Sequence, residues 1–224
     1  MNRIQNCIKI TTRVGALDLQ VDSRFSNAFI IISGENGAGK TTLLRCLAGL
    51  EQAAGQLQFG NKIYMDSIAG FELPSGHRQL GCVWTDAALL PWLSIEKNIL
   101  LGTESVDSAW LAKLADKFEI SSFMQRKPHM LSTGEAQRAA LVRAIYKRPS
   151  VLLLDEPFSA QAPAIRQRLR LSLKSMQAAM QIPVLMVSHD VEDARVLAHH
   201  HWRMREGKLL VDVAHIGMQQ EMQA

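Results

Sequence analysis

The chain has 224 residues, of which 47% are hydrophobic and 21% are charged, and its formal net charge at pH 7 is +4. This composition excludes an intrinsically disordered chain, because such chains lack the apolar side chains that a folded core needs. The mildly basic charge suits an anionic ligand, but it does not separate a nucleotide from a nucleic acid or a membrane surface. The longest apolar runs are far shorter than the roughly 20 residues that span a bilayer.

The three cysteines, Cys7, Cys46 and Cys82, form no closely spaced pair and are odd in number. They therefore favour a reducing compartment over a disulfide framework. No apolar run follows Met1, so no signal peptide is predicted. We expect any association with a membrane to go through a partner.

The first part of the chain is typical of short antiparallel strands. Ile4–Ile10 and Ala16–Val21 predict two strands, the second with alternating apolar residues. Gln56–Met65 predicts a hairpin that turns at Gly60 and Asn61. We expect an N-terminal antiparallel β-subdomain.

Three unbroken aliphatic runs have a different character: Phe29–Ile32, Val151–Leu154 and Val184–Val187. Runs of this kind are typical of parallel strands that are buried on both faces of a sheet. Each leads through a polar turn into a helical pattern, which predicts an α/β fold.

The stretch from Trp92 to Arg148 contains apolar residues at helical spacing and no strand candidate, so it predicts an inserted helical subdomain. Pro163 favours the start of an amphipathic helix over Ala164–Met180. Arg203–Val213 predicts a terminal hairpin that turns at Glu206 and Gly207.

The strongest motif follows the strand candidate Phe29–Ile32 and opens a predicted helix over Thr41–Leu50. It matches the pattern GxxxxGK[ST] and reads Gly34-Glu35-Asn36-Gly37-Ala38-Gly39-Lys40-Thr41, with Thr42 next. Its glycines allow backbone N–H groups to point at phosphate oxygens, and the helix N-terminus adds positive charge. The pattern predicts a phosphate loop, in which Lys40 contacts the β- and γ-phosphates and the Thr41 hydroxyl binds Mg²⁺.

A second candidate is the pair Asp155 and Glu156, which follows Val151–Leu154. Carboxylates at the carboxyl end of a parallel strand lie where such sheets bind ligands. We expect Asp155 to hold Mg²⁺, through water, and Glu156 to orient and deprotonate the attacking water. Two acids alone could equally form a solvated turn, but a phosphate loop in the same chain favours the catalytic interpretation.

A third motif lies between these two and reads Leu131-Ser132-Thr133-Gly134-Glu135, followed by Ala136-Gln137-Arg138. It resembles the LSGGQ signature of ABC-type ATPases. Ser188-His189-Asp190 resembles the switch histidine motif of that family, and all four motifs occur in the family's order. The resemblance covers nearly the whole chain and implies an α/β P-loop NTPase core with a mixed or parallel sheet.

The resemblance also implies a mechanism with ATP and Mg²⁺. Two ATPase subunits pair head to tail, and each ATP lies between one phosphate loop and the partner's signature. It implies that Ser132, Gly134 and Glu135 contact that nucleotide, and that His189 contacts the γ-phosphate. Locally, Ser132 and Glu135 have capping-box spacing, so a helix is predicted to begin there and end near Arg148.

Several positions depart from the family pattern. Thr85 stands where the family has a glutamine that reaches Mg²⁺, and Ala162 replaces an aspartate that communicates across the dimer. Thr133 replaces a signature glycine and would be strained if that position required a positive φ. No aromatic residue stands where adenine usually stacks, and Arg13 is the substitute through its planar guanidinium.

The resemblance implies one ATPase domain, with an ATP-binding core at 1–91 and 149–224 and a helical signature subdomain at 92–148. Several phrases, among them Ala87–Trp92 with Leu93–Ile99, resemble importer ATPases for molybdate and related oxyanions. That implies a subunit at the cytoplasmic face of the cell membrane, paired with an identical second subunit and a transmembrane permease. A substrate-binding protein would be an indirect partner, and molybdate is the narrowest substrate suggested.

Two alternatives remain open. One is a non-transport ABC protein that acts on nucleic acid, although the chain is too short for the tandem units or long insertions typical of that group, so no nucleic-acid partner is expected. The other is a degenerate subunit that binds ATP but hydrolyses it slowly. Thr85 and Ala162 favour it, and the intact residues Lys40, Asp155, Glu156 and His189 oppose it. His199, His200 and His201 do not predict a metal site, because adjacent residues of a helix point about 100° apart.

Overall fold

The computed structural model describes residues 6–214. The chain divides into two compact units, one made of Met1–Arg78 and Pro183–Ala224 and the other of Gln79–Ile182. These limits differ from the predicted division into 1–91 with 149–224 and 92–148. That functional division stays a prediction.

The antiparallel part of the first unit contains β1 (Asn6–Val14), β2 (Leu17–Phe25), β4 (Ala54–Phe59), β5 (Lys62–Asp66) and β6 (Phe71–Glu72). Their order in the sheet is β6-β5-β4-β1-β2, with every neighbouring pair antiparallel. The predicted hairpin over 56–65 is confirmed as β4 and β5. The first two strands were predicted to end too early, because the pairing of β1 continues to Val14 and that of β2 continues to Phe25. The start of the first predicted strand, at residues 4 and 5, lies outside the described residues.

The parallel part of the first unit contains β3 (Phe29–Ser33), β9 (Val184–Val187), β10 (His200–Arg205) and β11 (Lys208–Ala214). Strand β3 pairs in parallel with β9 on one side and with β10 on the other. Strand β11 pairs with β10 as the predicted terminal hairpin and joins β2 in parallel. Because β3 and β9 are buried on both faces, their unbroken aliphatic composition is explained.

Two helices complete the first unit. Helix α1 (Lys40–Ala48) begins one residue before the predicted start, and α6 (Val191–Leu197) follows β9. The buried guanidinium of Arg78, next to the 3₁₀ turn Ser75–His77, donates to the carbonyl oxygens of Cys46 and Leu47 at 3.1 and 2.8 Å. These carbonyls lie in the last turn of α1, where few helical N–H partners remain, so the guanidinium of Arg78 supplies further donors beside the Gly49 N–H, which also bonds the Cys46 carbonyl.

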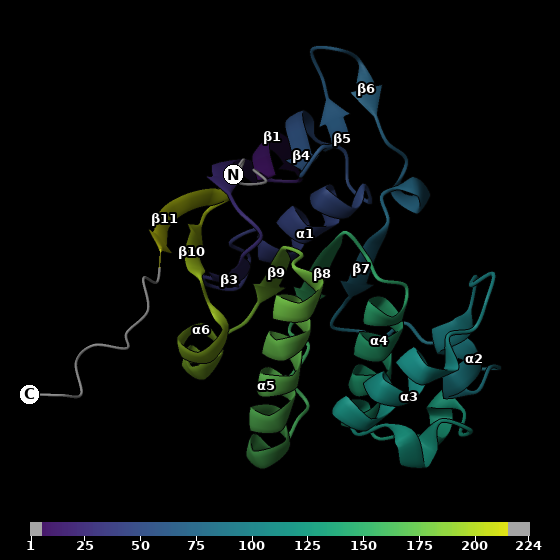
Figure 1. Cartoon of the computed structure of the whole chain (residues 1–224). Coiled ribbons are helices and arrows are strands. Elements are labelled where there is room, and N and C mark those ends of the chain that lie inside the picture. Colours follow the sequence, from purple (N-terminus) through teal and green to yellow (C-terminus); the bar gives the residue numbers. More distant parts are fainter. Residues whose placement is uncertain (1–5, 215–224) are drawn as a thin grey trace, which may run out of the picture. The chain divides into compact units, whose positions relative to one another are not determined.

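The second unit contains a parallel pair of strands, β7 (Leu80–Val83) and β8 (Val151–Asp155). Its helices are α2 (Ile95–Leu100), α3 (Ser108–Lys117), α4 (Thr133–Tyr146) and α5 (Pro163–Met180), with 3₁₀ turns at Ser121–Phe123 and Pro128–Met130. Helix α4 packs against β7, and α2 and α3 pack against α4 (Figure 1). The helical character predicted for 92–148 is therefore confirmed.

The α/β class with a mixed parallel and antiparallel sheet is confirmed as well. Within residues 6–214, no helix has the length and apolarity needed to cross a membrane.

Candidate nucleotide site

The predicted phosphate loop leaves β3 and opens α1 in the first unit. Gly34, Gly37 and Gly39 all have positive φ, at +151°, +80° and +98°. A side chain at such φ values is strained, so the glycines allow the loop to wrap tightly and turn its N–H groups inward. Gly39 directly precedes Lys40, the first residue of α1, so the loop lies at a helix N-terminus, where anions are stabilised.

The terminal hairpin closes against this loop. The backbone N–H of Gly207, in the turn between β10 and β11, donates to the carbonyl of Ala38 at 3.0 Å. A Cβ atom placed on Gly34 would overlap the carbonyl oxygen of Met204. Gly34 is therefore required by packing as well as by its backbone conformation.

Lys40 is nearly buried, with 7% of its surface exposed. Its amine donates to the carbonyl oxygens of Gly34 and Glu35, at 2.9 and 2.8 Å. The two carbonyls hold the cation over the loop that the glycines form. This position is consistent with a lysine that contacts phosphate oxygens at that loop.

The switch motif lies at the same edge of the sheet as the phosphate loop. Strands β3 and β9 are parallel neighbours with Ile32 opposite Val187, so Gly34 and His189 both follow carboxyl ends of adjacent strands. The Ser188 hydroxyl donates to the buried carboxylate of Asp193, which fixes the turn, and the side chain of His189 is exposed. Arg13, also in this unit, is exposed on β1 and lies 3.6 Å from Asp18.

In the second unit, the acidic pair ends β8 as predicted. Asp155 is the last residue of the strand and is 4% exposed, whereas Glu156 is half-buried and has a φ of +50°. Non-glycine residues with positive φ are uncommon and frequently lie at functional sites. Ser159 donates to the Glu156 carbonyl through its N–H at 3.2 Å and its hydroxyl at 3.1 Å, which supports this turn.

The signature segment forms the capping box that its sequence predicts. The N–H of Glu135 donates to the Ser132 hydroxyl at 3.2 Å, and the Glu135 carboxylate accepts from the Ser132 N–H at 2.8 Å and from its hydroxyl at 2.9 Å. The bond from the Ser132 N–H, and then that from its hydroxyl, hold the pKa of Glu135 below its usual value. Thr133 is the first residue of α4 and has no positive φ, so the expected strain at this position is absent.

A buried amide cluster connects the signature helix to the segment after Glu156. Gln161 donates to the Gly134 carbonyl at 2.8 Å, and Gln137 donates to the Ser159 hydroxyl at 2.9 Å while accepting from the N–H of Ala160 at 3.2 Å. A Cβ atom on Gly134 would lie 2.9 Å from the Ala160 carbonyl oxygen, so a larger residue would push the two segments apart. Sequence reasoning missed Gln137 and Gln161 as site residues, although two glutamines close to the motifs were a visible signal.

Thr85, which the resemblance placed at the family's glutamine position, is exposed in the segment just after β7. From α4, Arg143 donates to the carbonyls of Ala87 and Ala88 at 3.0 and 2.7 Å, and its burial lowers the pKa of its guanidinium. The N–H of Ala88, whose φ is +46°, donates to Asp86 at 3.1 Å. The segment is therefore fixed to the signature helix, a role of Arg143 that the sequence did not reveal.

The next residues form a surface held by one buried side chain. The amide of Asn98 accepts from the N–H of Leu90 at 2.7 Å and donates to the carbonyls of Leu90, Leu93 and Ser94. Trp92, between these anchors, is 66% exposed. A fixed backbone that presents an exposed indole is typical of an interaction surface.

The three adjacent histidines are not helical, contrary to the geometry assumed above. His199 precedes β10 and accepts from the Phe29 N–H at 2.9 Å, whereas His200 and His201 belong to β10. His201 Nε2 lies 2.8 Å from the Ser33 hydroxyl. In the part of the chain that the structure describes, no group of three or more potential ligands could hold a metal ion.

Within the first unit, the phosphate loop and His189 follow the carboxyl ends of the adjacent strands β3 and β9, whereas Arg13 lies on β1 in the antiparallel part. Within the second unit, Thr85 and the acidic pair lie at the carboxyl ends of the adjacent parallel strands β7 and β8, and Gln161 connects the segment after Glu156 to Gly134 of the signature. Fold and motifs define a P-loop nucleotide-binding α/β protein that carries a signature helix.

Similarities in sequence and fold to known proteins support this class. The chain matches the ABC transporter family over residues 23–159. It is 37% identical over 182 residues to a molybdenum import ATP-binding protein of Azotobacter vinelandii, covering 79% of this chain and 50% of that protein. It is 38% identical over 202 residues to an Fe(3+) ions import ATP-binding protein of Rhizobium meliloti, covering 87% and 49%.

A solved dimeric ATP-binding cassette in a post-hydrolysis state, bound to ADP and Pi, superposes with a TM-score of 0.80 at 23% identity, covering 95% of this chain and 99% of that chain. This likeness concerns the fold. The chain belongs to the ABC transporter family. It spans about half the length of the curated relatives that it matches.

Proposed function

We propose that the chain is the ATP-binding and ATP-hydrolysing subunit of an ABC importer. The observation that carries the proposal is the phosphate loop, with a buried Lys40 held over three glycines of positive φ at the start of α1. Such a loop binds the phosphates of a nucleoside triphosphate through its N–H groups, its lysine and the helix N-terminus.

The remaining residues then take the following roles. Thr41 and Asp155 supply a hydroxyl and a carboxylate oxygen, which are the hard donors that Mg²⁺ prefers, and Thr85 adds a hydroxyl through water. When bound, Mg²⁺ neutralises charge on the phosphates. Glu156 orients and deprotonates the attacking water, and His189 contacts the γ-phosphate.

The signature contacts the ATP that is bound by a second copy of the chain, through Ser132, Gly134 and Glu135. The N-terminus of α4 favours anions, and the capping box fixes the backbone there. In this proposal the ATP bound by one subunit is closed by the signature of the other, as in a head-to-tail homodimer. Arg13 stacks against adenine through its guanidinium.

The surface around Trp92 is proposed as the site that receives a transmembrane permease at the cytoplasmic face of the membrane. Its backbone is fixed by Asn98 and Arg143, so the position of the permease could be transmitted to α4. The import names of the relatives support this direction, and molybdate remains the narrowest substrate supported by a relative's name. A substrate-binding protein would act on the permease and have no direct contact with this chain.

The decisive experiment compares the chain with Glu156→Gln, using phosphate release for turnover and calorimetry for MgATP binding. We expect the variant to bind MgATP like the parent and to turn over roughly 10²-fold or more slowly, because a positioned general base contributes on this scale. Glu104→Gln, at an exposed glutamate of the same unit, should change neither quantity. Unchanged turnover in Glu156→Gln would refute the role of Glu156, and a parent chain that binds MgATP without hydrolysing it would favour the degenerate alternative.

A further inference from the structure

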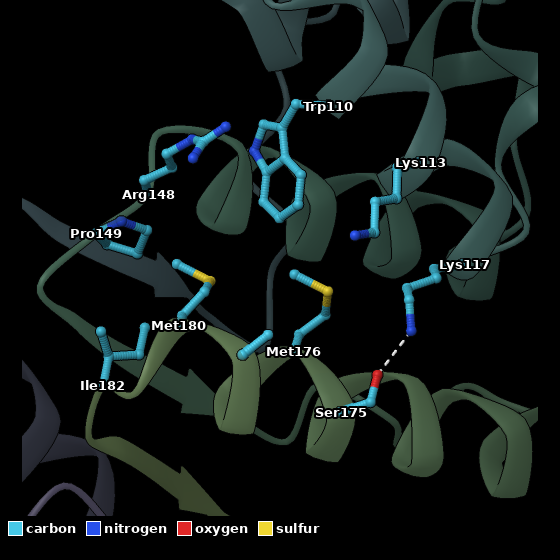
Figure 2. A pocket seen from close by; sticks show the side chains of 10 residues that line it. Trp110, Lys113, Lys117, Arg148, Pro149, Ser175, Met176, Met180 and Ile182 are labelled. Carbon is cyan, nitrogen blue, oxygen red and sulfur yellow. Dashed lines mark hydrogen bonds between the residues drawn. The ribbon is translucent and has the colours of Figure 1, made fainter.

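A cavity of about 410 Å³ lies within the second unit and involves none of the residues discussed above as a nucleotide site. Figure 2 shows it between α3, the residues after α4, and α5. Its principal lining residues are Trp110, Lys113, Lys117, Arg148, Met176 and Met180. Its volume lies in the range of sites that bind small molecules.

The charged residues of the cavity share one sign. Lys113, Lys117 and Arg148 line it, and among the described lining residues there is no carboxylate. Lys117 is positioned by a hydrogen bond of 2.6 Å from its amine to the Ser175 hydroxyl (Figure 2). Arg148 is positioned from outside the cavity by Asp107, whose carboxylate lies 3.0 Å from its guanidinium.

Trp110 forms a wall whose orientation is fixed. Its indole N–H donates to the carbonyl of Tyr146 at 3.1 Å. The guanidinium of Arg148 lies 4.9 Å from the centre of the Trp110 ring, and the amine of Lys113 lies 5.9 Å from it. Both distances are typical of cation–π contacts, so two positive charges are held beside an aromatic surface.

The opposite side of the cavity is apolar. Figure 2 shows Met176 and Met180 of α5 across the cavity from Trp110. The other apolar lining residues are Pro149, Ala179 and Ile182. Methionine side chains are flexible and polarisable, and they adapt well to flat or irregular apolar ligands. The cavity therefore combines a fixed indole and an adaptable apolar floor with a cationic rim.

We propose that this cavity binds a small organic anion with a flat apolar body, such as an aromatic carboxylate. The ring lies between Trp110 and the two methionines, and the carboxylate pairs with Arg148, whose planar guanidinium can bind it through two parallel hydrogen bonds. Lys113 and Lys117 add charge at the same rim. The site does not depend on the nucleotide chemistry proposed above.

The test uses 2-naphthoate as the probe and the full chain labelled with ¹³C at the methionine methyl groups. A bound ring shifts nearby methyl signals, and Met176→Leu and Met180→Leu assign the two signals of interest. We expect saturable shifts confined to these two methyls, with a dissociation constant on the order of 1 mM for a ligand of this size. The neutral analogue 2-naphthalenemethanol should bind at least about five-fold more weakly, because it lacks the charge-assisted pairing.

Two variants locate the anion. Arg148→Gln and the double variant Lys113→Gln/Lys117→Gln should each weaken naphthoate binding about five-fold or more. The control is Lys174→Gln. Lys174 is an exposed lysine of α5, the helix that carries Met176 and Met180, but it does not line the cavity, so its replacement should leave the affinity for naphthoate unchanged. The proposal is overturned if naphthoate shifts neither methyl, shifts methionines throughout the chain to the same extent, or binds no better than the neutral analogue.

Discussion

The side-chain amide of Gln161 donates to the backbone carbonyl of Gly134 at 2.8 Å, so a buried residue after the acidic pair holds the first turn of the signature helix. The two residues are 27 positions apart in the chain. Their bond passes between the two segments that carry the candidate catalytic and signature residues of the second unit. A change on one side of this bond should therefore be felt on the other.

Replacing Gln161 by leucine should test that link. The substitution keeps the size of the side chain but removes the donor, and a hydrogen bond of this kind contributes about 1 kcal/mol to the free energy of unfolding. We expect a loss of that size in urea denaturation. Gln125→Leu, at an exposed glutamine of the same unit, should stay within about 0.5 kcal/mol of the parent. Equal stability of Gln161→Leu and the parent would mean that the bond contributes nothing net.

The capping box makes a second prediction. Ser132→Ala removes the hydroxyl that accepts from the Glu135 N–H, and the loss of such a cap typically costs about 1 kcal/mol. Ser105→Ala, in an exposed loop, is the matched control and should be neutral. The measurement is again the free energy of unfolding in urea, and a Ser132→Ala variant as stable as the control variant would contradict it.

The carboxylate of Glu135 predicts a dependence on pH. Its pKa is lower in the folded chain than in the unfolded chain, so its contribution to stability is complete above the unfolded value of about 4.3 and disappears as the pH falls through the folded value. The difference in unfolding free energy between the parent and Glu135→Gln should therefore be larger at pH 7 than in acid. Denaturation of both chains across this range measures it, and a difference independent of pH would exclude this linkage.

Among the buried residues of the first unit, we expect Arg78 to be one whose substitution lowers the free energy of unfolding most. Its side chain is 1% exposed, pairs with Glu72 at 3.1 Å and caps the last turn of α1. Arg78→Met would remove the guanidinium donor from the carbonyl oxygens of Leu47 and Leu73, at a cost of roughly 2–4 kcal/mol. Arg45→Met, which breaks the exposed pair with Glu51, should cost less than about 1 kcal/mol. Similar costs for the two variants in urea denaturation would refute the capping role.

The free cysteines provide a chemical prediction. Burial raises the pKa of Cys46 to about 11 and that of Cys82 to about 12. At pH 8 no more than about one molecule in a thousand would carry either thiolate, which is the reactive form. Cys7, which is partly exposed, should therefore account for the fast phase with a thiol reagent, and Cys7→Ser should remove that phase. A fast phase that persists in Cys7→Ser would show that Cys46 or Cys82 reacts despite its raised pKa.

Much of this architecture could be predicted from the sequence because its signals are local. The phosphate loop, the capping box at Ser132 and the hairpin turns at Gly60 and Gly207 each depend on residues that are close together in the chain. The aliphatic runs of β3 and β9 likewise reveal burial on both faces without any knowledge of their partners.

The rest depends on contacts between distant residues. No sequence pattern predicts that Arg143 donates to the carbonyls of Ala87 and Ala88, which are 56 and 55 positions away. Nor does any pattern predict that the buried amide of Asn98 bonds to the backbone of Leu90. The helical geometry assumed for the adjacent histidines was wrong because β10 adds to the edge of β3, and this pairing overrides local preference. The Gln137–Gln161 cluster was missed because its hydrogen bonds join residues that are more than 20 positions apart in the chain.

The closure of the terminal hairpin on the phosphate loop has a consequence for biosynthesis. Gly207 and Met204 contact the predicted phosphate loop at Ala38 and Gly34 across about 170 residues, so this side of the loop has no packing partner until the ribosome has made nearly all of the described chain. A nascent chain that stops before β10 would carry the glycine-rich motif in its sequence without the backing that shapes it. Competence to hold a nucleotide should therefore appear late during translation and abruptly.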